Sequence, residues 1–325
     1  MPDVQTQEDD EYLCYSKPLK GEVYYITSFD PIYNPEATHH MILFGCDDPT
    51  YEEVAWPCAE HLPVCRDEAK IIFSWAMNAP SYHMPPDTSF KIGGKGFRNL
   101  VLQVHYKDAS YFTQSPDRTD ASGWKLGMLD SPTPFLSGIY IFIDSASSLP
   151  PKEKTLVAMA CRYTGEVKLH PFAFRTHAHS HGLLNAAYVI HHGVKYLIGE
   201  KSPQEPQTFY PVLNKSLEVQ PGDKLEASCL FNNNEDREIH MGHTRNDEMC
   251  NFYMMYSVPK EDAAQLDDPK NQNCLQSIDP KTGSRLVSVP HNHHHGLQTV
   301  TEIPLEDLEN EQEDMYFNPF GQILE

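Results

Sequence analysis

The residues of this 325-residue chain best suited to chemistry are its 17 histidines, which are gathered in a few places rather than spread evenly. Three places combine histidine with strand-like neighbours: His39 with His40, then His105, then His177 with His179. Neutral imidazole is a frequent metal ligand. The grouping therefore predicts metal sites, although any one of these histidines taken alone would be an ordinary surface or core residue.

The spacing of these histidines says which of them can share an ion. His177 and His179 stand two apart, which places both side chains on one face of a strand. His181 continues that face, so spacing leaves open which two bind. His39 and His40 are adjacent and would point to opposite faces of a regular strand. Both can bind one ion only if the backbone bulges or leaves the strand there.

The eight cysteines bear on the compartment and on the metal. They are even in number and form no Cys-x-x-Cys pair, which favours four disulfides in an oxidising compartment over eight buried thiols. Zinc prefers thiolate, histidine and carboxylate, and disulfides remove the thiolates. Imidazoles with a thioether suit copper, and Met249 is the candidate thioether. The alternative for Met249, beside Cys250, is ordinary core packing.

Other histidines are expected to be structural or incidental. They are His191 with His192 near a glycine turn, His240 with His243 in a polar loop, and the tract at 293–295. A histidine tract binds adventitious metal without being a built site.

Charge and composition exclude several classes of partner. The net charge of -21 argues against nucleic acid and anionic membrane surfaces. No run approaches the ~18 apolar residues of a membrane helix, so no membrane span is expected. The acidic start, residues 1–11, does not resemble a signal peptide. Residues 291–325 are predicted to be an acidic, disordered tail or linker, and one glycosylation sequon, Asn214-Lys215-Ser216, gives weak support for secretion.

Short β-type runs, not helical periodicity, recur along the chain. They cover residues 23–27, 100–106, 138–143, 187–190, 224–230 and 252–256. Runs of this kind, with Pro- and Gly-rich turns between them, are typical of sandwiches or barrels. The length suggests two domains, and the Pro-rich stretch 130–134 predicts their connection. We therefore predict an all-β chain with domains at 1–130 and 135–290 and the tail beyond them.

Taken in order, the motifs resemble those of the copper type II, ascorbate-dependent monooxygenases. In this sequence they are Thr38-His39-His40-Met41, Gln103-Val104-His105-Tyr106, Arg175-Thr176-His177-Ala178-His179 and Glu248-Met249-Cys250-Asn251-Phe252-Tyr253. The resemblance covers residues 14–290. Within the family it favours the branch that hydroxylates peptides ending in glycine, because the catecholamine branch normally carries an extra N-terminal domain.

The resemblance implies a division of labour among the named residues. The first, electron-transfer copper would be bound by His39, His40 and His105. The second, oxygen-activating copper would be bound by His177, His179 and Met249. The peptide carboxylate would meet Arg175, Asn251 and Tyr253, with Gln103 as a further polar group. The implied fold is two antiparallel, jelly-roll-like β-sandwiches facing each other across a cleft. The implied disulfides are Cys14–Cys58, Cys46–Cys65, Cys161–Cys274 and Cys229–Cys250.

The implied reaction hydroxylates the α-carbon of a C-terminal glycine, with ascorbate as reductant, O2 as co-substrate and two coppers per chain. No lyase domain follows, so a separate amidating lyase would complete the reaction in a secretory lumen or after secretion. Vertebrate relatives carry a fifth disulfide that this chain cannot form, which predicts a loosely held segment before Cys14.

Three alternatives remain open from the sequence. One is a related copper monooxygenase that hydroxylates a small aromatic amine. Another is a non-catalytic, secreted copper-binding module on the same fold. The last is a structural β-sandwich with chance histidines, which would bind no stoichiometric copper.

Overall fold

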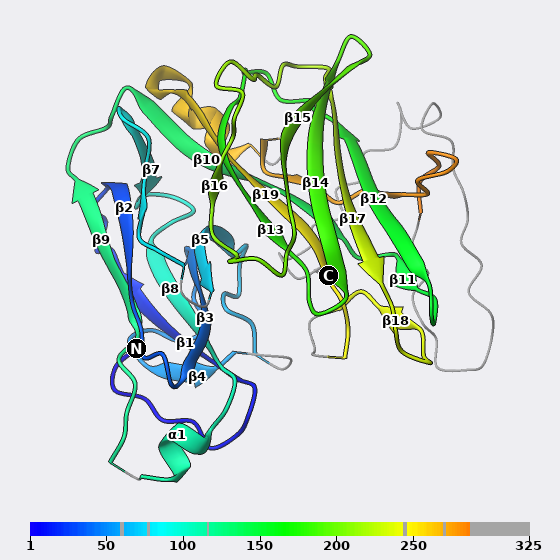
Figure 1. Ribbon diagram of the computed structural model, residues 1–325. Helices are drawn as coiled ribbons and strands as arrows, with labels where there is room; N and C mark the ends of the chain where they lie inside the picture. The colour runs from blue at the N-terminus through cyan, green and yellow to red at the C-terminus, as the bar shows by residue number, and fades with distance from the viewer. Residues whose placement is uncertain (59–61, 77–78, 116, 243–245, 269–270, 287–325) are drawn as a thin grey trace.

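The computed structural model describes residues 1–58, 62–76, 79–115, 117–242, 246–268 and 271–286, so the predicted tail at 291–325 lies outside the described residues. Strands dominate the described chain, which confirms the all-β prediction. All six predicted β-runs fall within strands, apart from Val23 at the start of the first run. Figure 1 shows the N-terminal half, residues 1–129, beside the C-terminal half, residues 135–286.

The N-terminal half contains a five-stranded sheet in the order β4-β1-β8-β3-β5. Its strands are β1 (Glu11–Pro18), β3 (Thr38–Cys46), β4 (Ala55–Pro57), β5 (Lys70–Ala76) and β8 (Asn99–Tyr106). Leu43 and Phe73 of this sheet share an apolar cluster with Ile26 and Phe29, which lie on the opposing strand β2 (Tyr24–Ile32). The short helix α1 (Ser110–Thr113) follows β8.

A nine-stranded sheet is shared by the two halves. Its main path is β16-β13-β19-β10-β7-β2-β6, with β9 beside β2 and β20 beside β10. The strands not yet given are β6 (Tyr82–His83), β7 (Thr88–Ile92), β9 (Gly123–Leu129), β10 (Phe135–Asp144), β13 (His170–His177), β16 (Tyr210–Pro211), β19 (Cys250–Pro259) and β20 (Asn273–Cys274). β10 pairs in parallel with β7 at Phe135–Thr88 and Leu136–Ser89. The sheet therefore continues past the predicted connection at 130–134, which runs between β9 and β10.

The C-terminal half closes a second sandwich with a sheet in the order β15-β14-β17-β12-β21. Its strands are β12 (Lys154–Arg162), β14 (Gly182–His191), β15 (Val194–Lys201), β17 (Lys224–Asn232) and β21 (Ser277–Ile278). Residues from this sheet, such as Val157 and Phe231, share a core with Phe142, Phe252 and Met254 of the nine-stranded sheet. The pair β11 (Ser148–Leu149) and β18 (Ile239–His240) and the 3-10 helix η1 (Lys260–Asp267) complete this half.

The two halves also share an apolar cluster. Ile139, Phe209 and Tyr253 of the C-terminal half lie in the same buried cluster as Phe73 and Phe90 of the N-terminal half. The rings of Phe73 and Phe209 stack with centroids 5.3 Å apart. Buried apolar contact of this kind, together with the β7–β10 pairing, holds the halves together.

Four disulfides hold the described chain: Cys14–Cys58, Cys46–Cys65, Cys161–Cys274 and Cys229–Cys250. They are the four pairs that the resemblance implies, and no described cysteine is free. The expectation of a loosely held segment before Cys14 is wrong. Val4 forms an antiparallel bridge with Asp120, and the Met1 amino group donates a hydrogen bond to the Ser122 carbonyl, so hydrogen bonds hold this segment against residues 120–122.

Candidate metal centres

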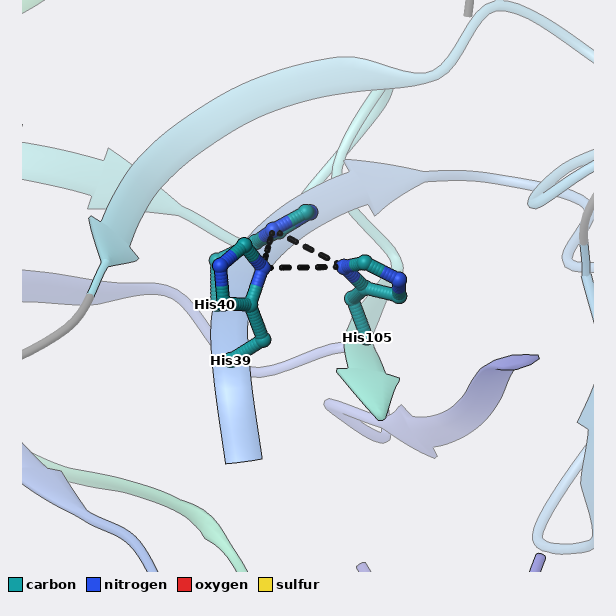
Figure 2. A group of neighbouring side chains, drawn as sticks. All are labelled: His39, His40 and His105. Carbon is teal, nitrogen blue, oxygen red and sulfur yellow. Dashed lines mark hydrogen bonds between the residues drawn. The ribbon is translucent and has the colours of Figure 1, made fainter. Parts of the chain in front are cut away.

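The first histidine group converges on one point. The Nδ1 atoms of His39, His40 and His105 lie 3.1 to 3.3 Å from one another. Figure 2 shows the three rings meeting, two from β3 and one from β8. Nitrogens that all bond one ion at about 2 Å must lie within about 4 Å of each other, so this set fits a single metal ion.

A β-bulge makes this convergence possible. In the pairing of β3 with β8, Thr38 is opposite Tyr106 and His40 is opposite His105, which leaves His39 as the extra residue. A bulge bends the strand and turns neighbouring side chains towards the same side. The condition that the sequence set for adjacent histidines to share one ion is therefore met by the backbone.

Residues near the N-terminus brace the first group. The ring of Tyr12 stacks on His105 with centroids 4.2 Å apart. The Asp10 carboxylate lies 3.2 Å from Nε2 of His105, which leaves Nδ1 of that ring as the metal-facing nitrogen. Burial, followed by the charges of His105, His39, His177 and Arg175, holds the pKa of His40 well below its ordinary value. His40 therefore stays neutral, as a ligand must, and it lies within electrostatic reach of the second group.

The second group is built where a strand ends. β13 ends at His177, so the prediction that one strand face carries His177, His179 and His181 is wrong. The reason lies in the buried Glu248, whose carboxylate accepts hydrogen bonds from the backbone N–H groups of His179 and His181, both at 2.7 Å. These bonds hold the chain in a turn that leads into β14.

Hydrogen bonds at Nδ1 select the nitrogen that each ring presents. His177 Nδ1 lies 2.7 Å from Gln207 Oε1, and His179 Nδ1 lies 2.8 Å from the Asp247 carbonyl. Both acceptors require a proton on Nδ1, so Nε2 is left to bind metal in both rings. His181 differs, because its two ring nitrogens face the carboxylates of Glu248 and Glu235.

Met249 is held beside His179 by the same carboxylate. Its backbone N–H lies 3.1 Å from Oε2 of Glu248, the atom that also accepts from His179. Cys250, the next residue, is bonded to Cys229 across the C-terminal sandwich. The chain at Met249 is thus fastened on both sides, and its Sδ lies 3.7 Å from Nδ2 of Asn251, the residue paired with His177. A thioether combined with imidazoles suits copper.

The predicted substrate residues lie opposite one another on paired strands. Arg175 faces Tyr253, and His177 faces Asn251, in the register of β13 with β19. The Arg175 guanidinium lies 5.2 Å from the centre of the Tyr253 ring, and the Asn251 amide lies 3.4 Å from the Tyr253 hydroxyl. These positions group Arg175, Asn251 and Tyr253 beside His177.

Arg175 is a buried cation that lacks an acidic partner within the described chain. It is 5% exposed. Its Nε donates to the Gln207 carbonyl at 2.9 Å and its Nη2 to Gln207 Oε1 at 3.1 Å, and no described carboxylate forms an ion pair with it. Burial lowers the pKa of the guanidinium. A buried positive charge with only neutral partners favours a ligand that brings a carboxylate.

Gln103 is not brought into this group by any contact. It is buried in β8, and its amide nitrogen faces the carbonyl and the sulfur of Cys58 at 3.4 and 3.7 Å. Its predicted role towards substrate stays a prediction.

Among the other predicted bystanders, His191 pairs with the buried Asp223 and His240 lies exposed on β18. His192 is the neighbour of His191 at a hairpin turn, with a φ of 48°. His243 and residues 293–295 lie outside the described residues.

Sequence reasoning missed the residues that hold the ligands. They are Asp10 and Tyr12 at the first group and Gln207, Glu248 and Asn185 at the second, where the Asn185 amide donates to the carbonyls of His177 and Asn251. Glu248 could have been predicted from the sequence, because it stands directly before the candidate ligand Met249. Asp10, Tyr12 and Gln207 are far in sequence from the histidines that they touch and carry no local signal.

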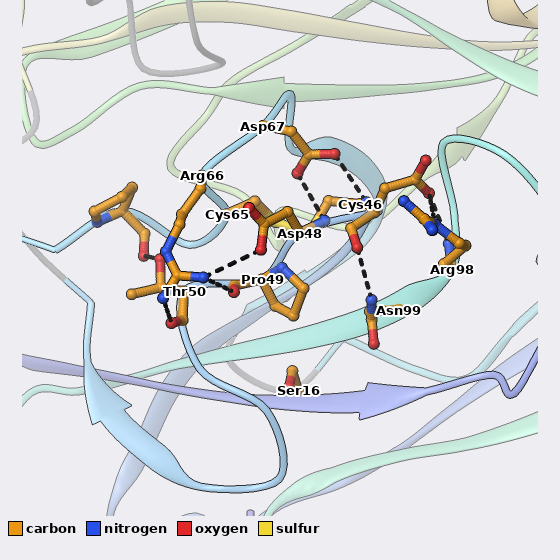
Figure 3. The surroundings of a disulfide bond; sticks show 12 residues. Ser16, Cys46, Asp48, Pro49, Thr50, Cys65, Arg66, Asp67, Arg98 and Asn99 are labelled. Atoms are coloured by element: carbon orange, nitrogen blue, oxygen red, sulfur yellow. Dashed lines mark hydrogen bonds and ion pairs between the residues drawn. A yellow bond between two sulfur atoms is a disulfide. The ribbon is translucent and has the colours of Figure 1, made fainter.

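One further set of ligand-type atoms, Cys46, Cys65 and Asp67, comes together in the described chain. Figure 3 shows that the two sulfurs form a disulfide, and the Asp67 carboxylate accepts the backbone N–H groups of Asp47 and Asp48. Disulfide sulfur is not a thiolate, so this set is structural.

Fold and site together define a β-sandwich protein with two histidine groups, one of them beside a buried guanidinium. Residues 1–113 match the copper type II ascorbate-dependent monooxygenase N-terminal domain, and residues 135–287 match the C-terminal domain of the same family. The chain belongs to the copper type II, ascorbate-dependent monooxygenases.

The chain is similar to curated relatives from several animals. It is 36% identical over 286 residues to peptidyl-glycine alpha-amidating monooxygenase A of Xenopus laevis, which covers 86% of this chain and 29% of the relative. It is 38% identical over 284 residues to the Rattus norvegicus peptidylglycine alpha-amidating monooxygenase, covering 86% of this chain and 28% of the relative. It is 28% identical over 287 residues to human dopamine beta-hydroxylase, covering 78% of this chain and 45% of the relative. The chain spans less than a third of the amidating relatives.

Proposed function

We propose that this chain hydroxylates the α-carbon of a C-terminal glycine in peptides, the first step of C-terminal amidation, with ascorbate as reductant and O2 as co-substrate. Membership of the family supports a copper- and ascorbate-dependent oxidoreductase. The greater identity to the amidating relatives than to dopamine beta-hydroxylase favours a peptide over an aromatic amine.

The observation that carries the choice of substrate is the buried Arg175. In a peptide that ends in glycine, the C-terminal carboxylate is bonded directly to the α-carbon that is to be oxidised. Arg175 stands two residues before His177 on the same strand and is held at its Nε and Nη2 by Gln207. The guanidinium would receive the carboxylate, with the Asn251 amide and Tyr253 hydroxyl as neighbouring donors.

We assign two coppers to the chain. His39, His40 and His105 would hold the first, and His177, His179 and Met249 the second. Copper, when bound, supplies one-electron redox chemistry and activation of dioxygen. The protein's contribution is to keep the imidazoles neutral, to present chosen ring nitrogens and to position the peptide. Burial and the Arg175 charge lower the pKa of His177 to about 3, which keeps that ring available at neutral pH.

We further propose that the protein works in a secretory lumen or outside the cell, where four disulfides persist. Asn214 lies exposed and is available for glycosylation. No helix within the described part of the chain has the length and apolarity to cross a membrane. A separate lyase would act on the hydroxylated product, and nucleic acid is not expected to bind.

We propose two domains, residues 1–130 and 135–290, with a cleft between them. The shared nine-stranded sheet means that these domains are joined by strand pairing as well as by the connecting chain.

The test of substrate class compares Arg175→Ala with Arg175→Lys on two short peptides, one ending in glycine and one ending in glycine amide. Loss of the carboxylate contact should raise KM for the free acid by about 100-fold, the cost of one desolvated charged contact of about 2–3 kcal/mol. Arg175→Lys keeps the positive charge but loses the two-pronged guanidinium, so its KM for the free acid should lie between those of the unaltered enzyme and Arg175→Ala. Equal turnover of the glycyl peptide by Arg175→Ala and the unaltered enzyme, or a preference for an aromatic amine, would refute the peptide assignment.

The test of the copper assignment is a titration followed to saturation in His105→Ala and in Met249→Ala. Each variant should lose one copper, and the lost copper should differ between them. Loss of both coppers from either variant, or of neither, contradicts two separate centres. Stoichiometric copper without oxygen uptake on any glycyl peptide would indicate a copper-binding module in place of an enzyme.

A further inference from the structure

One segment of the C-terminal half is fastened at both of its ends to different parts of the molecule. It lies between β15 and β16 and carries Gln207 and Phe209, two residues apart. The Gln207 end contacts the second histidine group, and the Phe209 end contacts the N-terminal half.

The Gln207 end organises two functional side chains at once. Its Oε1 lies 2.7 Å from His177 Nδ1 and 3.1 Å from Arg175 Nη2. Its own amide nitrogen donates to the carbonyls of Ala178 and Pro203 at 3.3 and 3.0 Å, which fixes the orientation of the amide. The position of this one amide therefore sets both the His177 ring and the Arg175 fork.

The Phe209 end is held by aromatic rings of the other half. Phe209 is 5% exposed. Its ring lies 5.3 Å from the ring of Phe73 on β5 and 5.8 Å from that of Tyr82 on β6. Both contacts belong to the apolar cluster that the two halves share.

The geometry points to Phe209 as a positioning residue for the second centre, anchored in a socket that the N-terminal half supplies. With its ring packed against those of Phe73 and Tyr82, Phe209 holds the backbone at Gln207, and Gln207 in turn orients His177 and Arg175. This inference rests on the proposed roles of His177 and Arg175. It makes the second centre depend on the other half of the molecule, whereas the first centre is braced by Tyr12 and Asp10 of its own half.

The experiment isolates each centre and then removes the anchor or its socket. In the His105→Ala background the remaining copper reports on the second centre, and in the Met249→Ala background it reports on the first. Phe209→Ala should weaken copper binding at the second centre about tenfold, measured in the His105→Ala background, because it removes support behind a metal ligand. Copper binding at the first centre, measured in the Met249→Ala background, should not change. Phe73→Leu, a change in the N-terminal half, should act in the same direction on the second centre.

Two variants separate positioning from general packing. Phe90→Ala removes a ring of the same cluster that packs edge-on against Phe97, so it should lower the unfolding temperature and leave both coppers in place. Phe209→Leu restores most of the buried volume and should restore copper binding even if Phe209→Ala does not fold. In the otherwise unaltered enzyme, Phe209→Leu should raise KM for a glycyl peptide slightly and Phe209→Ala should raise it more. The change in kcat should be smaller than the change in KM.

The inference is overturned if Phe209→Ala and Phe90→Ala change copper binding equally, or if Phe209→Ala or Phe73→Leu weakens the first centre as much as the second. It is also overturned if Phe209→Leu binds copper no better than Phe209→Ala. These readings use copper affinity alone, so they hold even if the enzyme acts on a different substrate. Failure of the two backgrounds to lose one copper each would count against the proposed centres themselves.

Discussion

The two histidine groups are assembled by different structural means. The first takes all its ligands from two paired strands, β3 and β8, and a single bulge at His39 turns the rings together. In the second group, His177 is the last residue of β13 and is still paired with β19, whereas His179 and Met249 lie outside the strands. Backbone pairing positions the first group, whereas polar side chains, chiefly the buried Glu248 and the half-buried Gln207, position the second. The second group should therefore be more sensitive to changes that never touch a ligand.

The surroundings differ in charge as well as in support. His105 of the first group has a carboxylate, Asp10, behind its ring. His177 of the second has the neutral Gln207 behind its ring and the Arg175 cation beside it. A carboxylate makes an imidazole a stronger donor to metal, whereas a nearby cation disfavours its protonation and draws in anions.

The largest expected effect is at Glu248. Glu248→Ala removes a fully buried acceptor shared by the backbone of His179, His181 and Met249. We expect the free energy of unfolding of the copper-free protein to fall by about 3–5 kcal/mol, because buried donors lose their partner. Denaturant unfolding measures this, and copper titration should show the second copper lost and the first retained.

The control is Glu235→Ala, which removes the exposed carboxylate on the other side of His181. It should cost less than about 1 kcal/mol. If the two variants were equally stable, or if Glu248→Ala kept its second copper, side-chain support of that group would be disproved.

The next effect is the pH dependence of the copper-free protein. The pKa of His177 is lowered to about 3 in the folded state from the ordinary 6.5. Below pH 6.5 the His177 imidazole binds a proton in the unfolded chain but not in the folded protein. The free energy of unfolding therefore decreases as pH falls from 6.5 towards 3. At pH 5 the loss from this residue should be about 1–2 kcal/mol.

Denaturant unfolding of the unaltered protein and of His177→Asn at pH 7 and pH 5 tests this. The asparagine does not titrate, so the variant should lose less stability on acidification by that amount. The same pH slope in both proteins would show that His177 titrates normally in the folded state.

The smallest effect is expected at Asp10, because strand pairing already positions the first group. Asp10→Asn should weaken the first copper about tenfold and leave the second unchanged. The neighbouring Asp9, whose carboxylate accepts the backbone N–H of Ala109, supplies the matched control Asp9→Asn. A larger loss of copper in Asp10→Asn than in Glu248→Ala would reverse the ranking of the two groups.

Strand positions were accessible from the sequence because apolar and β-branched runs with turn residues between them encode them locally. The prediction failed where side chains override strand geometry, as at His179, whose N–H bonds to Glu248 in place of a neighbouring strand. It also missed the sharing of one sheet by both halves, since the pairing of Phe135 with Thr88 joins residues with no sequence signal in common.

By itself the sequence determined the all-β class, the β-runs, the ligand types and the ordered motifs that indicate the family. Each of these depends on residue identity and short-range spacing. Tertiary structure alone decided that His39 and His40 can face one point, that Arg175 lacks an acidic partner in the described chain, and that Gln207 and Phe209 join the second group to the other half. Those outcomes depend on a bulge, on burial and on contacts between distant residues. They arise only when the chain packs, because the free energy of a hydrogen bond or a buried ring is set by what surrounds it.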